Sequence, residues 1–178
     1  MSRVGKKPIS LPQGVTVSVA GDVCTVKGKR GELVVAVSPG IEVVVKDGTV
    51  TVSRKGNSAR HRALHGLTQR LLVNAAEGVS KGFVRRLEMS GVGYRIALKG
   101  RKLEMELGFS HPVIYEPPAG VTLSIEEKNI IVVAGADKQQ VGHVAAELRR
   151  VKPPDPYKVK GIKYAGEVIH RKVGKVGA

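Results

Sequence analysis

The sequence has no tryptophan, two phenylalanines, four tyrosines and a single cysteine among its 178 residues. One cysteine excludes an internal disulfide, and Cys24 lies in an alternating run where a small buried side chain is expected. So few aromatic rings argue against a sheet that reads unpaired bases by stacking. Apolar runs such as residues 130–134 are far too short to span a membrane, and the N-terminal stretch lacks the apolar core of a secretory signal. We therefore expect a cytoplasmic protein.

Acidic residues are also scarce. Fifteen Asp and Glu oppose 30 Lys and Arg, which leaves a formal charge of +15. Such a self-repelling excess indicates a polyanionic partner, and nucleic acid is favoured because no long basic amphipathic helix suits a membrane surface. The sequence has no HExxH, GxSxG or GxxxxGK[ST] motif, and its carboxylates mostly alternate with apolar strand residues. We predict a binding protein without catalytic residues, metal, cofactor or small-molecule substrate.

An internal repeat divides the sequence into two similar halves, each a set of strands followed by a helix. The matching segments are residues 23–28 with 94–100, 32–37 with 103–107, 50–52 with 130–133, and the helical patterns from Ala59 and Lys138. Period-two alternation, as in Leu103, Met105 and Leu107, predicts sheets with one buried face. Glycines between the strands favour the tight turns of antiparallel meanders.

These patterns predict the α+β class. We expect two related domains, residues 1–82 and 83–178, each a mostly antiparallel sheet covered by one helix, with an irregular basic C-terminal extension. The first helix should begin after Asn57 or Ser58 and end near Gly78. The second should end before Pro153. The predicted buried stripes are Ala63, Leu64, Leu67, Leu71 and Ala75 in the first helix, and Val141, Val144, Ala145 and Leu148 in the second.

The basic residues gather at the C-terminal end, where residues 149–178 hold nine Lys or Arg against Asp155 and Glu167. Three prolines between residues 153 and 156 should make the chain leave the second helix extended, with Lys158 and Lys160 on one side. A short strand over residues 162–164 should follow Gly161. Two readings are open: a solvated tail, or a segment from Tyr157 to Tyr164 that is mobile in the free protein and becomes ordered on RNA.

Two spacings invite more specific readings. Gly91 and Gly93 are spaced like the start of a dinucleotide fingerprint, but a strand pattern follows them instead of a helix, so a bulge or a close backbone approach is favoured. His61 and His65 are four residues apart on the first helix, yet no cysteine or carboxylate pair accompanies them as further metal ligands. We therefore expect surface or phosphate-contacting histidines.

The remaining reading is recognition of folded RNA through its shape, phosphates and 2′-hydroxyls. Two rivals stay open: an architectural DNA-binding protein, which would bind duplex DNA equally well, and an RNA-modifying enzyme, which would alter a substrate.

Four stretches resemble the family of bacterial large-subunit ribosomal protein L6. They are residues 3–9 (RVGKKPI), 64–67 (LHGL), 108–112 (GFSHP) and 156–164 (PYKVKGIKY), and the resemblance covers nearly the whole chain. The sequence departs from the usual family pattern at Val159 and Lys163, where the family has Gly and Arg. Valine stiffens the backbone, and lysine keeps the charge but loses a bidentate fork.

The resemblance implies two related α+β domains, binding to 23S rRNA chiefly through the second, neighbouring ribosomal proteins of the large subunit, and a position near the sarcin-ricin loop. It places the protein in the cytoplasm, in the large ribosomal subunit. By matching motif, the residues expected to face RNA are Gly91, Gly93, Tyr94, Arg95, Ser110, His111, Tyr157, Lys158, Lys160 and Lys163.

Overall fold

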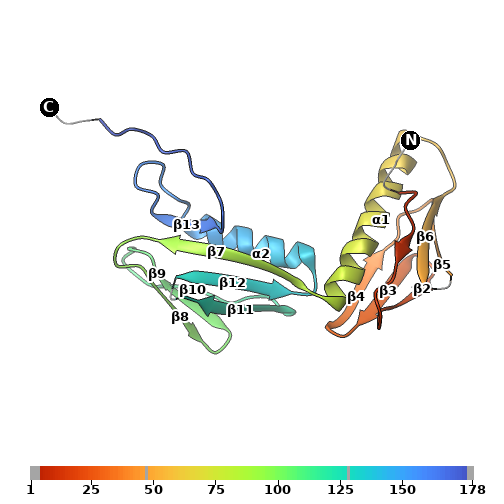
Figure 1. Ribbon diagram of the computed structural model, residues 1–178, viewed down its shortest axis with the longest axis horizontal. Helices are drawn as coiled ribbons and strands as arrows, with labels where there is room; N and C mark the ends of the chain where they lie inside the picture. The colour runs from red at the N-terminus through yellow and green to blue at the C-terminus, as the bar shows by residue number, and fades with distance from the viewer. Residues whose placement is uncertain (1–4, 47, 128, 176–178) are drawn as a thin grey trace. The chain divides into compact units, whose positions relative to one another are not determined.

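The computed structural model describes residues 5–46, 48–127 and 129–175 (Figure 1). The chain divides into two compact units. Unit 1 holds the residues up to Gly82 together with Ala136–Lys138, and unit 2 holds Phe83–Gly135 and the residues from Gln139 onward. No helix of the described residues is long and apolar enough to cross a membrane. That each half folds as an independent domain stays a prediction.

Unit 1 consists of two small antiparallel sheets and one long helix. Its elements are β1 (Ile9–Ser10), β2 (Thr16–Ala20), β3 (Val23–Gly28), β4 (Gly31–Ala36), β5 (Ile41–Lys46), β6 (Thr49–Arg54) and α1 (Ala59–Ser80). The strand orders are β2-β3-β4 and β1-β6-β5. Cys24 and Val26 of β3 are fully buried in the core beneath α1, which confirms the small buried cysteine.

Unit 2 has the same plan with one strand added. Its elements are β7 (Phe83–Ser90), β8 (Arg95–Lys99), β9 (Lys102–Glu106), β10 (Val113–Tyr115), β11 (Val121–Glu126), β12 (Ile130–Gly135), α2 (Lys138–Val151) and β13 (Gly161–Tyr164). The strand orders are β10-β9-β8 and β11-β12-β7-β13. Figure 1 shows α2 lying along the larger sheet, with β13 beside β7. The predicted α+β class is confirmed.

The sheet orders confirm the internal duplication but correct its alignment. The order β5-β6-β1 in unit 1 corresponds to β11-β12-β7 in unit 2, and the central strands of the other two sheets are β3 and β9. The sequence match of residues 23–28 with 94–100 paired β3 with β8, and was therefore wrong by one strand. Successive strands of a meander share the same period-two alternation, so alternation cannot decide which strands correspond.

The two helices differ in how well their buried faces were predicted. In α2 the buried residues are Val141, Val144, Ala145 and Leu148, as predicted, and the helix ends before Pro153. In α1 the predicted stripe is right only in part: Ala75 is buried and Leu64 and Leu71 pack against the core, whereas Ala63 is exposed and Leu67 is 51% exposed. The buried residues of α1 are His65, Thr68, Gln69, Leu72, Ala75, Ala76, Gly78 and Val79.

His65 explains why the buried face of α1 was misjudged. Its Nε2 lies 3.0 Å from the carbonyl oxygen of Val52, and the Arg54 guanidinium lies 3.3 Å from its Nδ1. A carbonyl only accepts and a guanidinium only donates, so the ring is neutral with its proton on Nε2. These contacts satisfy the polar ring inside the unit, and the expectation of a surface histidine is wrong for His65. The helix begins where expected, with Ser58 as its N-cap.

Candidate nucleic-acid interface

A tight turn of residues 91–94 joins β7 to β8. The N–H of Tyr94 donates to the carbonyl of Gly91 at 3.4 Å, and Gly93 has a φ of +80°, as a type II turn requires at its third residue. A Cβ on Gly91 would lie 2.5 Å from the Tyr94 ring. Gly91 therefore makes room for a side chain of its own turn, and a turn stands where a bulge was the alternative; a close approach of this backbone to RNA stays a prediction. Val92 at the tip is 89% exposed.

The loop of residues 107–112, between β9 and β10, packs beside this turn. The Tyr94 ring also faces Gly108, where a Cβ would lie 3.5 Å away. Gly93 from the turn and Ser110 and His111 from the loop line one hollow of about 350 Å³. Tyr94 is thus half-buried and holds the two loops together, while Ser110 and His111 are exposed. Two stretches singled out in the sequence form one surface.

The end of α2 adjoins the same loop. The Lys152 ammonium lies 4.2 Å from the centroid of the Phe109 ring, a cation–π contact. The backbone carbonyl of Lys152 also accepts a hydrogen bond from the N–H of Ile162 at 2.7 Å, near the start of β13. Sequence reasoning missed both Phe109 and Lys152. The only available signal was Phe109, a rare aromatic residue that is 43% exposed, inside the GFSHP stretch.

Residues 155–160 form a compact turn, which corrects the prediction of an extended segment. The Asp155 carboxylate accepts from the backbone N–H groups of Tyr157 at 3.3 Å and Lys158 at 3.1 Å. The N–H of Asp155 donates to the carbonyl of Lys160 at 2.9 Å, and Val159 adopts a left-handed φ of +57°. Period-two reasoning therefore fails for Lys158 and Lys160, because an aspartate that hydrogen-bonds its own backbone favours a turn.

The next residues belong to the sheet. Ile162 is fully buried, so the prediction of a solvated tail is wrong for β13, and the short strand itself is confirmed. Mobility of residues 157–164 in the free protein stays a prediction. Lys163 is paired with Glu88 on β7 at 2.8 Å, which offsets its charge. Lys158 is exposed and Lys160 half-buried, and neither has a carboxylate partner among the described residues. Tyr157 and Arg95 are also exposed.

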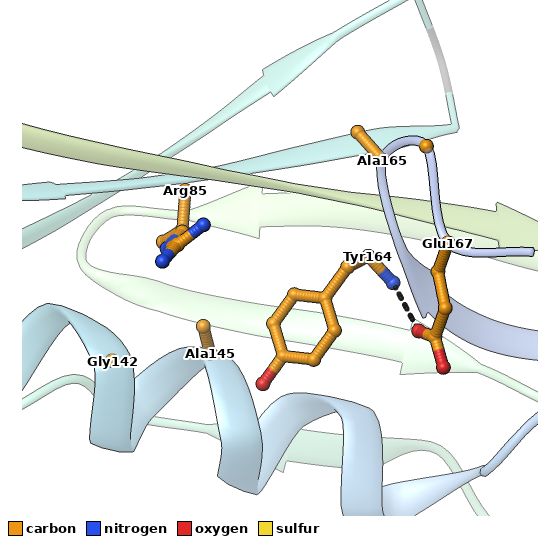
Figure 2. Close-up of a pocket in the computed structure, with 7 residues that line it drawn as sticks. Arg85, Gly142, Ala145, Tyr164, Ala165 and Glu167 are labelled. Carbon is orange, nitrogen blue, oxygen red and sulfur yellow. Dashed lines mark hydrogen bonds between the residues drawn. The ribbon is translucent and has the colours of Figure 1, made fainter.

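The chain beyond β13 is anchored to α2. Arg149 donates two hydrogen bonds to the Glu167 carboxylate, at 3.0 Å and 2.5 Å. This hydrogen bonding lowers the pKa of Glu167. Figure 2 shows Tyr164 lying against α2 near Ala145, with its N–H bonded to Glu167 at 2.9 Å. A second hollow of about 450 Å³ is lined by Tyr164, Glu167, Ala145 and Arg85, among others. The residues from 170 to 175 are exposed.

The described residues contain no group of three or more His, Cys, Asp or Glu side chains placed to hold a metal ion. His61 is instead engaged within unit 1, with its Nδ1 2.6 Å from the Ser58 hydroxyl.

Comparison with known proteins decides the family. A sequence profile described as Ribosomal protein L6 matches residues 11–82 and 90–165, one segment in each unit. The chain belongs to the ribosomal protein L6 family. It is 52% identical over 177 residues to large ribosomal subunit protein uL6 of Maridesulfovibrio salexigens, covering 99% of each chain. It is 51% identical over 178 residues to the uL6 protein of Thermus thermophilus, covering 100% of this chain and 99% of that one.

Family membership confirms the resemblance drawn from the four stretches. Members of this family are structural ribosomal proteins and not enzymes, so the expectation of a structural, non-catalytic protein is confirmed. The rival reading of an RNA-modifying enzyme is thereby rejected.

Proposed function

We propose that the chain is a cytoplasmic component of the large ribosomal subunit that binds 23S rRNA, chiefly through unit 2, by shape and phosphate contacts. Relatives of 49% to 52% identity named large ribosomal subunit protein uL6 support the assignment to that subunit. Other large-subunit proteins would be its neighbours. The family resemblance is the reason for proposing a position near the sarcin-ricin loop.

One observation carries the choice of unit 2. The turn at Gly93, the loop with Ser110 and His111, and the end of α2 lie side by side, linked through Phe109 and Lys152. This surface presents turn and loop backbone, which can approach a folded RNA closely, next to cations without carboxylate partners.

The site residues have unequal roles in this proposal. Gly91 and Tyr94 support the surface, because the Tyr94 ring packs against Gly91 and Gly108. The hollow in this surface is lined by Gly93, Ser110 and His111. Arg95, Tyr157, Lys158 and Lys160 would reach phosphates, sugars or bases around it. Lys163 would contribute less, because Glu88 already neutralises it.

A salt titration tests the proposal. Affinity of the full chain for 23S rRNA should fall linearly with salt on a log–log plot, and should exceed affinity for duplex DNA at every salt concentration. Changing Lys158→Ala together with Lys160→Ala should lower the magnitude of the slope by about 2. The matched control is Lys99→Ala with Lys102→Ala, whose ammonium groups are paired with Glu104 and Glu116 at 2.6 Å and 3.1 Å. Equal affinity for DNA and rRNA would refute the proposed recognition of rRNA by its shape and favour binding to any polyanion.

A further inference from the structure

Unit 1 contains a pair of arginines that the proposed interface in unit 2 does not use. Arg54 ends β6, and Arg62 lies in the first turns of α1. The residues between them turn the chain from the strand into the helix. Both guanidinium groups converge on Asn57 in this connection. Arg54 donates to its side-chain oxygen at 3.0 Å, and Arg62 donates to its backbone carbonyl at 3.3 Å.

The strand geometry explains how Arg54 reaches this place. Val50 and Val52 of β6 are buried under α1, and period-two alternation puts Arg54 on the same face, just beyond the core. Its guanidinium therefore also meets the buried His65, whose Nδ1 lies 3.3 Å away. Two neutral acceptors, an amide and an imidazole, hold the arginine in one orientation.

No carboxylate neutralises this pair. Among residues 5–46, 48–127 and 129–175, neither Arg54 nor Arg62 forms an ion pair. Glu42, on the strand beside β6, is bound by Lys55 at 3.1 Å. The first turn of α1 has no acidic residue, and it contributes the exposed Arg60 as well.

We infer that Arg54 and Arg62 form a second RNA contact, which binds backbone phosphate through unit 1. Guanidinium groups pair with phosphate oxygens through two parallel N–H donors, and each arginine here spends only part of its donors on neutral acceptors. Holding the side chains in place beforehand reduces the ordering cost of binding. The phosphate would bind to the arginine pair and not to the helix end. This second contact rests on the proposed function, and it extends RNA binding to a unit from which little affinity was expected.

An acidic protein partner is the alternative for such a pair. RNA is favoured because the whole chain carries a formal charge of +15, which indicates a polyanion far larger than one acidic side chain. Binding measured with protein-free rRNA separates the two partners.

The test compares single substitutions in the full chain. Arg62→Gln is the informative change, because its hydrogen bond is exposed and made to a backbone carbonyl, so folding should be little affected. The matched control is Arg70→Gln, which removes an exposed arginine of the same helix that lies outside the pair. With complete 23S rRNA, Arg62→Gln should lower the magnitude of the salt slope by about 1, whereas Arg70→Gln should leave it unchanged.

Hydroxyl-radical footprinting gives a second readout. Arg62→Gln should expose nucleotides that the double lysine variant of unit 2 still protects. An unchanged slope and footprint for Arg62→Gln would overturn the inference, whether the pair serves an acidic protein or only the local fold. The proposed function would survive that result if the lysine variant still lost affinity, and would itself fail if the unmodified chain did not prefer rRNA to DNA.

Discussion

Val159 adopts a left-handed φ of +57° in the turn that carries Lys158 and Lys160. This conformation costs an L-residue roughly 1–2 kcal/mol, whereas glycine loses about 0.5–1 kcal/mol through the greater freedom of its unfolded chain. The Val159→Gly variant should therefore have a free energy of unfolding that is higher than that of Val159→Ala by roughly 0.5–1 kcal/mol. Comparing Val159→Gly with Val159→Ala isolates the backbone effect, because both variants lose the outer methyl groups.

Gly142 in α2 supplies a control of opposite sign. A Cβ there would meet nothing within 4 Å, so Gly142→Ala should stabilise the helix by about 1 kcal/mol. Urea unfolding followed by tyrosine fluorescence measures both sites, because the sequence has no tryptophan and its four tyrosines all lie in unit 2. The two Val159 variants should differ in midpoint by about 0.5 M for a slope of about 1.5 kcal/mol/M. If Val159→Ala matches or exceeds Val159→Gly in stability, strain at this residue does not exist.

Three further predictions concern stability. Glu167→Gln should lower the free energy of unfolding by about 1–2 kcal/mol at pH 7, because the hydrogen bonds from Arg149 stabilise the charged carboxylate and lower the pKa of Glu167. This contribution is present above pH 4.5 and is lost as the pH falls through the lowered pKa. The urea midpoints of the variant and the wild type should therefore converge at low pH. Gly91→Ala should destabilise unit 2 by about 1–3 kcal/mol and weaken rRNA binding, because the added Cβ would clash with the Tyr94 ring; the control Gly142→Ala should do neither. If Gly91→Ala and the wild type had equal urea midpoints, the close packing of Gly91 against Tyr94 would be unimportant for stability. Leu72→Ala should lower the free energy of unfolding by about 2–5 kcal/mol, because Leu72 is buried, whereas the change of the exposed Leu67 to Ala should lower it by less than about 1 kcal/mol. Circular dichroism measures both. If Leu67→Ala were the more destabilising change, Leu67 would belong to the buried face of α1, as first predicted.

The sequence alone determined features that depend on local rules. Alternation and turn glycines predicted the strands, the 3.6-residue period located both helices, and Ser58 and Pro153 marked where one begins and the other cannot continue. The charge of +15 and the missing catalytic motifs indicated a nucleic-acid binder. Each of these signals is carried by neighbouring residues or by composition, so no knowledge of distant contacts was needed.

Only the tertiary structure decided which face of α1 is buried, because Val52 and Arg54 of β6 satisfy His65 inside the unit. It also decided the alignment of the two repeats, since strand order is a property of the sheet and not of alternation. The cation–π contact of Lys152 with Phe109, 43 residues apart in the sequence, has no local signal at all. Contacts between distant residues depend on how complete sheets and helices pack, and period and spacing carry no record of that packing.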